Sequence, residues 1–69
     1  LTMENRIRTL RKELGLSQEE LARRCGVTRQ TILAIEGDKY DPTLLLAFRL
    51  AAALGVTVDS LFTPPAMEP

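Results

Sequence analysis

The chain has 69 residues, nine of them basic and nine acidic, so its formal net charge at pH 7 is zero. This length is enough for one small domain, and no apolar run approaches the roughly 20 residues that a membrane-spanning helix needs. With one cysteine and no histidine, an internal disulfide is excluded and a structural zinc site is not expected.

The first predicted helix lies near the N-terminus, where apolar residues recur at Met3, Ile7, Leu10 and Leu14. Intervals of three and four residues produce one apolar stripe along a helix, and Gly15 is expected to end it as a C-cap. The residues before it are too polar for a secretory signal. The same segment concentrates basic side chains, at Arg6, Arg8, Arg11 and Lys12.

Two short helices joined by a tight turn are predicted next. Ser17 and Glu20 form the Ser-x-x-Glu pattern of a capping box that opens the second helix. Gly26 ends that helix, in the left-handed conformation that glycine adopts at low cost. Thr28 caps the third helix and Gly37 stops it. This layout is that of a helix-turn-helix motif. The expected inward-facing positions are Leu21, Ala22, Cys25, Ile32 and Ile35.

The C-terminal part of the chain predicts two further helices. One covers about residues 43–54, with Thr43 or Asp41 as its cap, and Thr57 caps a short fifth helix. Pro64 and Pro65 end the regular structure. The sequence therefore predicts one all-α domain, residues 1–69, with five helices and no strand. Its core covers about residues 3–62, and residues 63–69 form a loose tail.

The start and outer face of the third helix carry side chains that suit base recognition. The major groove admits one α-helix, and its base edges differ in their pattern of donors and acceptors. An arginine pairs well with guanine, a glutamine with adenine, and a small apolar side chain with a thymine methyl. Taken alone, Arg29 reads as a solvated surface charge, but the two-helix frame favours a base contact. The predicted base contacts are Thr28, Arg29, Gln30, Leu33 and Ala34.

Four further residues are predicted to bind DNA phosphates. Gln18 stands at the start of the second helix, where N–H groups and the helix dipole favour an anion. Lys39, Tyr40 and Thr43 follow the third helix and are placed to clamp the opposite wall of the groove. Three of them have a simpler alternative. These are that Gln18 only starts a helix, that Lys39 is a solvated loop charge, and that Tyr40 packs over the core.

These motifs resemble the phage-repressor and Cro family of helix-turn-helix proteins, often called Xre-like. The resemblance covers about residues 3–62. It is carried by Ile7-Arg8-x-Leu10-Arg11, Leu16-Ser17-Gln18-Glu19-Glu20-Leu21-Ala22, Gly26-Val27-Thr28-Arg29-Gln30-Thr31-Ile32, Ile35-Glu36-Gly37, Pro42-Thr43-Leu44 and Ala51-Ala52-Ala53-Leu54-Gly55-Val56.

The resemblance implies a compact five-helix, lambda-repressor-like domain that binds operator DNA, usually as a dimer. It also implies the phosphate contact of Gln18 and base contacts from the third helix. In addition, it implies a structural ion pair between Arg11 and Glu36. Two opposite charges beside apolar stripes would need each other, which makes Glu36 a scaffold residue rather than an acid–base catalyst.

The predicted fourth helix departs from the family, whose members often carry polar residues on its outer side. Here Arg49 is the only polar residue between positions 44 and 54. A helix that is apolar all round is expected to be buried all round, which in so small a domain indicates contact with a second chain. The alternative is that these residues fill the core or are exposed singly. The predicted homodimer surface is Leu45, Leu46, Phe48, Ala52 and Phe62.

The sequence bears on three functional classes. The first is a cytoplasmic, sequence-specific regulator of transcription that binds double-stranded operator DNA as a homodimer and represses by default. The second is a protein-interaction module such as an antitoxin-like partner, which the zero net charge and the apolar fourth helix favour. An enzyme is the least expected class, because Ser17 and Cys25 lack a base and no catalytic constellation exists. Cys25 is expected to be a small buried hydrophobe. No catalytic residue, metal, cofactor, membrane contact or small-molecule ligand is assigned.

Overall fold

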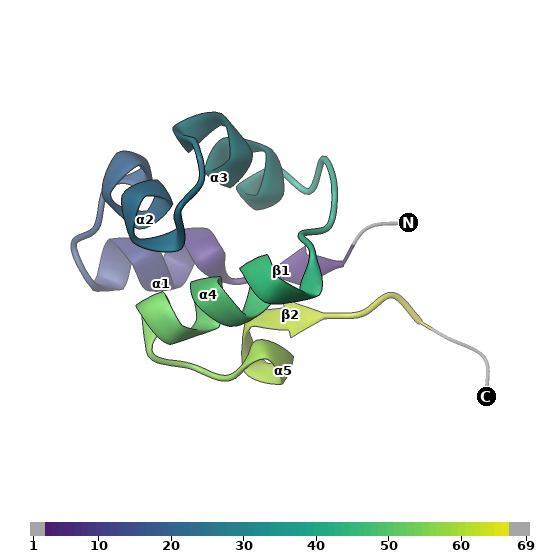
Figure 1. Cartoon of the computed structure of the whole chain (residues 1–69). Helices are drawn as coiled ribbons and strands as arrows, with labels where there is room; N and C mark the ends of the chain where they lie inside the picture. Colours follow the sequence, from purple (N-terminus) through teal and green to yellow (C-terminus); the bar gives the residue numbers. More distant parts are fainter. Residues whose placement is uncertain (1–2, 67–69) are drawn as a thin grey trace.

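Five α-helices make up most of the computed structural model, which describes residues 3–66 (Figure 1). They are α1 (Ile7–Glu13), α2 (Gln18–Cys25), α3 (Arg29–Glu36), α4 (Leu44–Leu54) and α5 (Val58–Leu61). Helices α2 and α3 lie on one side of the molecule, with α1 and α4 beneath them, and α5 packs below α4. The five helices predicted from the sequence are therefore present in the predicted order.

The helix ends follow the capping residues of the sequence. Ser17 Oγ accepts a hydrogen bond from the Glu20 N–H at 3.0 Å, and the Ser17 N–H donates to Glu20 Oε1 at 3.1 Å. This completes the predicted capping box of α2. Gly26, at φ 70°, ends α2 in the left-handed conformation that was expected of it. Each of these contacts spans only a few residues, which is why the sequence alone predicts them.

Two short strands correct the expectation that no strand is present. Strand β1 (Glu4–Asn5) pairs antiparallel with β2 (Phe62–Thr63), with Asn5 opposite Phe62. Two-residue strands have no measurable hydrophobic alternation, so periodicity could not reveal them. Thr63, the first residue of the expected tail, is part of β2, and residues 67–69 of that tail lie outside the described residues.

The core forms between the helices, although its boundary at α1 differs from the predicted stripe. Ile7 is fully buried and Leu10 packs against the core, but Leu14 is 55% exposed. Helix α1 begins only at Ile7 and ends at Glu13. Met3 and Leu14 therefore lie outside the helix, where its periodicity no longer sets the direction of a side chain. The inward positions predicted for α2 and α3 are buried as expected: Leu21, Ala22, Cys25, Ile32 and Ile35.

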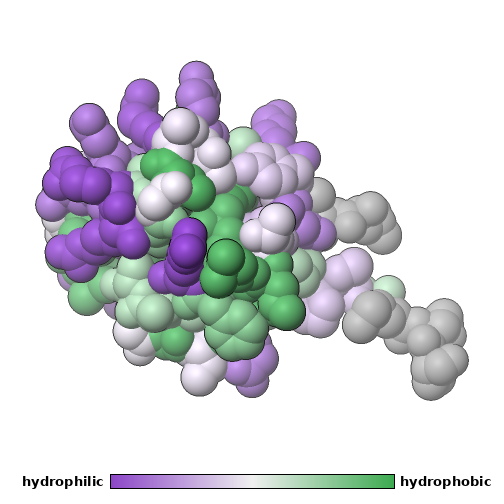
Figure 2. Space-filling view, in the orientation of Figure 1, coloured by the Kyte–Doolittle hydropathy of each residue, from purple (hydrophilic) through white to green (hydrophobic). Residues whose placement is uncertain are grey.

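Helix α4 buries one face and exposes the other. Leu46, Leu50 and Leu54 repeat every four residues, and all three are buried. The expectation that an all-apolar helix is buried all round is therefore wrong for this chain. Figure 2 shows the consequence as a hydrophobic patch over the front of α4, below a strongly hydrophilic region over α2 and α3. The exposed apolar side chains of α4 include Leu44, Leu45 and Phe48.

Two residues of the predicted dimer surface belong to the core instead. Leu46 is 9% exposed because it lies on the inner face of α4, and Phe62 is 4% exposed because its side chain packs inward from β2. The structure thus removes both from the predicted surface. Leu45, Phe48 and Ala52 are exposed and remain available for it.

Candidate nucleic-acid interface

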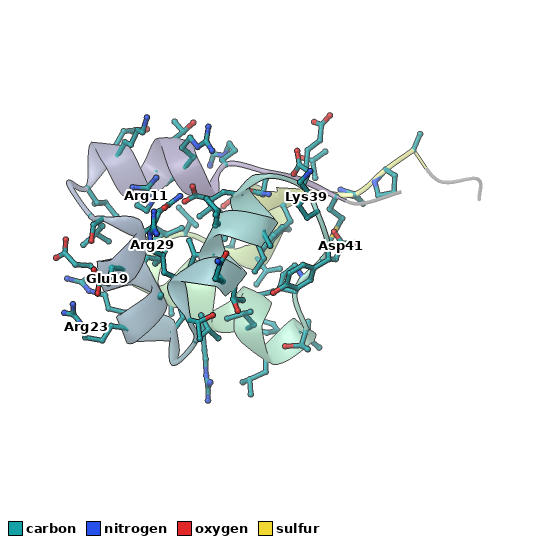
Figure 3. All side chains as sticks on the ribbon, turned by 90° about the horizontal axis from the view of Figure 1, so that it is seen from above. Arg11, Glu19, Arg23, Arg29, Lys39 and Asp41 are labelled. Carbon is teal, nitrogen blue, oxygen red and sulfur yellow. The ribbon has the colours of Figure 1, made fainter. Side chains whose placement is uncertain are left out.

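The first turn of α3 presents two long polar side chains to solvent. Thr28 is the N-cap of α3, so Arg29 and Gln30 are its first two residues, and both are exposed. Within residues 3–66, neither side chain has a hydrogen-bond or ion-pair partner. Figure 3 shows Arg29 on one side of α3 and Lys39 on the other. The guanidinium and the carboxamide are therefore free to meet an external ligand.

The other three predicted base-contact residues differ in how freely they are presented. The Thr28 hydroxyl serves the helix cap, because its Oγ1 accepts a hydrogen bond from the Thr31 N–H at 3.3 Å. Leu33 is exposed on the outer face of α3, and Ala34 is half-buried beside it. Leu33 therefore supplies most of the exposed apolar area among the predicted base-contact residues.

The buried carboxylate of Glu36 joins α1, α2 and α3. Glu36, at the end of α3, has no exposed side-chain area, and its Oε2 lies 2.7 Å from Arg11 Nε. The ion pair that was expected from the family resemblance is thus present. Arg11 Nη1 also donates to the Leu16 carbonyl at 2.9 Å, which ties the turn between α1 and α2 to the same group.

Two further side chains reach the same carboxylate. Gln18 Nε2 donates to Glu36 Oε1 at 3.1 Å, and Arg8 Nε lies 3.5 Å from that oxygen. Gln18 is therefore more than a helix-start residue, since it bridges α2 to α3. No individual role was predicted for Arg8. Its spacing of three residues from Arg11 on one helix was the available signal. We refer to Arg8, Arg11, Gln18 and Glu36 as the Glu36 cluster.

The Glu36 cluster lowers the pKa of Glu36. Burial by itself raises the pKa of this carboxyl, but hydrogen bonds from Arg11 and Gln18, the charge of Arg11 and the hydrogen bond from Arg8 outweigh it. The net result is a pKa below the ordinary value of 4.5. An acid whose pKa is lower in the folded state than in the unfolded chain stabilises the fold above the unfolded pKa.

We therefore expect acid to weaken the fold through Glu36. Its contribution is fully present above about pH 4.5 and is lost as the pH falls through the lowered pKa of the folded state. Urea unfolding of the wild-type protein and of Glu36→Gln between pH 7 and pH 3 measures this. The free energy of unfolding should fall more steeply in the wild type. Parallel curves for the two proteins would contradict the assignment.

The loop after α3 holds the remaining predicted contacts. Lys39 and Tyr40 are exposed, so Tyr40 is not part of the core. Asn5 braces the loop from β1, because its Nδ2 donates to the Ile35 carbonyl at 2.9 Å and to Asp38 Oδ1 at 3.2 Å. Thr43 Oγ1 accepts from the Leu46 N–H at 3.2 Å and caps α4. The strand β1 thus positions a segment that lies more than 30 residues further along the chain.

Other kinds of site find little support in residues 3–66. Cys25 is buried, and burial raises the pKa of its thiol, so it fills the core as predicted. No group of three or more cysteines or acidic residues in this part of the chain is arranged to hold a metal ion. None of the helices described has both the length and the apolar character to span a membrane.

Comparison with known proteins identifies the family of the chain. A family model described as helix-turn-helix matches residues 7–61. An HTH-type transcriptional regulator of Methanothermobacter thermautotrophicus is 64% identical over 53 residues, which are 77% of each chain. The immunity repressor protein of Bacillus phage phi105 is 36% identical over 61 residues, 88% of this chain and 42% of that protein.

A solved structure extends the agreement to three dimensions. The P22 c2 repressor protein, in complex with a synthetic operator, superposes with a TM-score of 0.77 at 31% identity. The match covers 78% of this chain and 82% of that one. The chain therefore belongs to the helix-turn-helix family of Xre-like, phage-repressor type, whose fold is that of DNA-binding transcription regulators and not of enzymes.

Proposed function

We propose that the protein is a cytoplasmic repressor that binds a two-fold operator as a homodimer, with α3 of each subunit in the major groove. The observation that carries this proposal is the exposed pair Arg29 and Gln30 at the start of α3, whose side chains have no partner among residues 3–66. An arginine can bind guanine O6 and N7 together, and a glutamine can bind adenine N6 and N7. Leu33 beside them suits a thymine methyl.

Residues on both sides of α3 bind phosphates in this arrangement. Gln18 lies at the start of α2, and Lys39, Tyr40 and Thr43 follow α3. Such contacts set the position of the protein on the duplex without reading its sequence. Because the whole chain has no net charge, non-specific attraction to DNA is weak, and the locally placed cations supply most of the electrostatic binding.

The exposed face of α4 supports the dimer. Leu45 is 61% exposed and Phe48 58%, and the patch continues through Ala52 into a surface pocket of about 270 Å³. Contiguous apolar surface on a small domain marks an interaction site more often than a free surface. A two-fold pair of these faces would present two α3 helices to half-sites about 34 Å apart. Occupation of such a site would block access by the transcription machinery.

Selection of bound sequences from a random DNA pool tests the function directly. A two-fold sequence with half-sites about one helical turn apart is the expected result. Recovery of a tight protein partner from cells, with no sequence enriched from the pool, would instead favour the alternative function as a protein-interaction module. The exposed apolar face of α4 is the observation that favours that alternative.

Two single substitutions should distinguish a base contact, which reads the DNA sequence, from a phosphate contact, which only positions the protein. Arg29→Ala should cost about 1–3 kcal/mol of operator binding and relax the preference at one base pair, because it removes a base contact. Lys39→Ala should weaken operator and scrambled DNA alike, because it removes a phosphate contact. Kd values for the selected operator, its single-base variants and a scrambled duplex measure both effects. Unchanged operator affinity in Arg29→Ala would mean that α3 is not the reading helix.

A further inference from the structure

We propose that Arg8 and Gln18 together bind one phosphate of the DNA backbone, with Glu36 holding both side chains in place. This inference rests on the proposed function and adds a residue, Arg8, that neither the motif nor the spacing of α3 indicates. The observation behind it is that two side chains from different helices contact the same oxygen atom. Arg8 from α1 and Gln18 from α2 meet at a single oxygen, Glu36 Oε1, at 3.5 Å and 3.1 Å.

The charge of the Glu36 cluster leaves one cation in excess. Arg11 satisfies the carboxylate in a buried, two-point contact, with Nε 2.7 Å from Oε2 and Nη2 3.3 Å from Oε1. Arg8 is therefore a second guanidinium on a carboxylate that is already neutralised. Its side chain is 59% exposed. The cluster carries a net positive charge, and that charge resides on its solvent-facing member.

The donors of these two side chains are only partly used. Arg8 approaches Glu36 through Nε, and no other partner holds the rest of its guanidinium within residues 3–66. Gln18 Nε2 has two hydrogens, and Glu36 takes one of them. A carboxylate only accepts hydrogen bonds, so the NH₂ group of Gln18 and not its carbonyl faces the cluster. A guanidinium fork beside an amide donor matches the oxygens of a phosphodiester.

The position of the pair favours nucleic acid as the source of the phosphate. Gln18 is the first residue of α2, and Glu36 is the last residue of the proposed reading helix α3. The excess charge therefore lies beside the start of α2 and the end of α3, the two helices of the helix-turn-helix. Arg6, in contrast, directs its Nε to the Ser60 carbonyl at 3.1 Å, on the side of α5. Arg6 thus offers a matched control, a nearby arginine that is turned away from the cluster.

Salt dependence of operator binding provides the first test. Each phosphate neutralised contributes a slope of about −0.9 to log K against log salt concentration. Arg8→Ala should reduce the magnitude of that slope by about one unit per subunit and weaken scrambled DNA by the same factor as operator. Arg6→Ala should keep the wild-type slope. Equal slopes for Arg8→Ala and Arg6→Ala would overturn the inference.

Neutral methylphosphonate groups, placed at one operator phosphate after another, give the second test. One substitution should weaken the wild-type protein but cost much less in both Arg8→Ala and Gln18→Ala, because all three changes remove the same contact. Different phosphates for the two variants would overturn the shared site while leaving the proposed function intact. A wild-type protein that binds no DNA would instead overturn the proposed function, and this inference with it.

Discussion

Glutamate at both Leu45 and Phe48 should lower the affinity for a full operator by about 10²–10⁴-fold while the domain stays folded. In the proposed dimer, the second subunit binds its half-site at a high effective concentration, and separated subunits lose that gain. Both side chains are largely exposed in the single chain. Surface substitutions of this kind usually change stability by no more than about 0.5 kcal/mol. Affinity for an isolated half-site should therefore change much less than affinity for the full operator.

The measurement needs a control for added negative charge, which by itself weakens binding to DNA. Thr9→Glu with Ala66→Glu adds the same two charges at exposed positions outside α4. This control should remain a dimer by light scattering and lose little of the preference for the full operator. A wild-type protein that stays monomeric at high concentration would contradict the dimer. A Leu45 and Phe48 variant that still dimerises would contradict the assignment of the dimer surface to α4.

Arg11→Ala should lower the free energy of unfolding by about 3–5 kcal/mol. The substitution removes the main partner of the buried Glu36 carboxylate, and breaking a buried ion pair on one side costs about that much. Glu36 has no exposed side-chain area and the Arg11 side chain only 10%, so water cannot replace the lost contact. A domain of this size has a total stability of order 5–10 kcal/mol. The loss would therefore remove a large part of the stability of the domain.

Urea unfolding of a small set of variants separates this effect from a simple loss of side-chain volume. Arg11→Met combined with Glu36→Met removes both charges together and should cost far less than either single change, because no charge is then stranded. Arg8→Ala should cost at most about 1 kcal/mol, since its contact with Glu36 is largely solvated. A cost below about 1 kcal/mol for Arg11→Ala would contradict the structural role of the pair.

Some features of the interface were predictable because they depend on neighbours in sequence. The exposure of Arg29 and Gln30 follows from the cap at Thr28 and the inward direction of Ile32 and Ile35. The contact partners of Gln18 were less predictable from the sequence. Its link to Glu36 joins residues 18 positions apart, and Arg8 reaches the same oxygen from another helix. Family resemblance suggested the Arg11 pair, but nothing local indicated that four side chains would meet.

The sequence by itself determined where α2 and α3 begin and end, because caps such as Ser17 and Thr28 bond to backbone groups only three residues away. It determined the inward face of a helix only where polar residues marked the opposite face. Helix α4 lacks that contrast, so packing against the other elements decided that Leu46 is buried and Leu45 exposed. Tertiary structure also decided the pairing of β1 with β2 and the meeting of Arg8 with Gln18, since both require segments distant in the chain to be brought together.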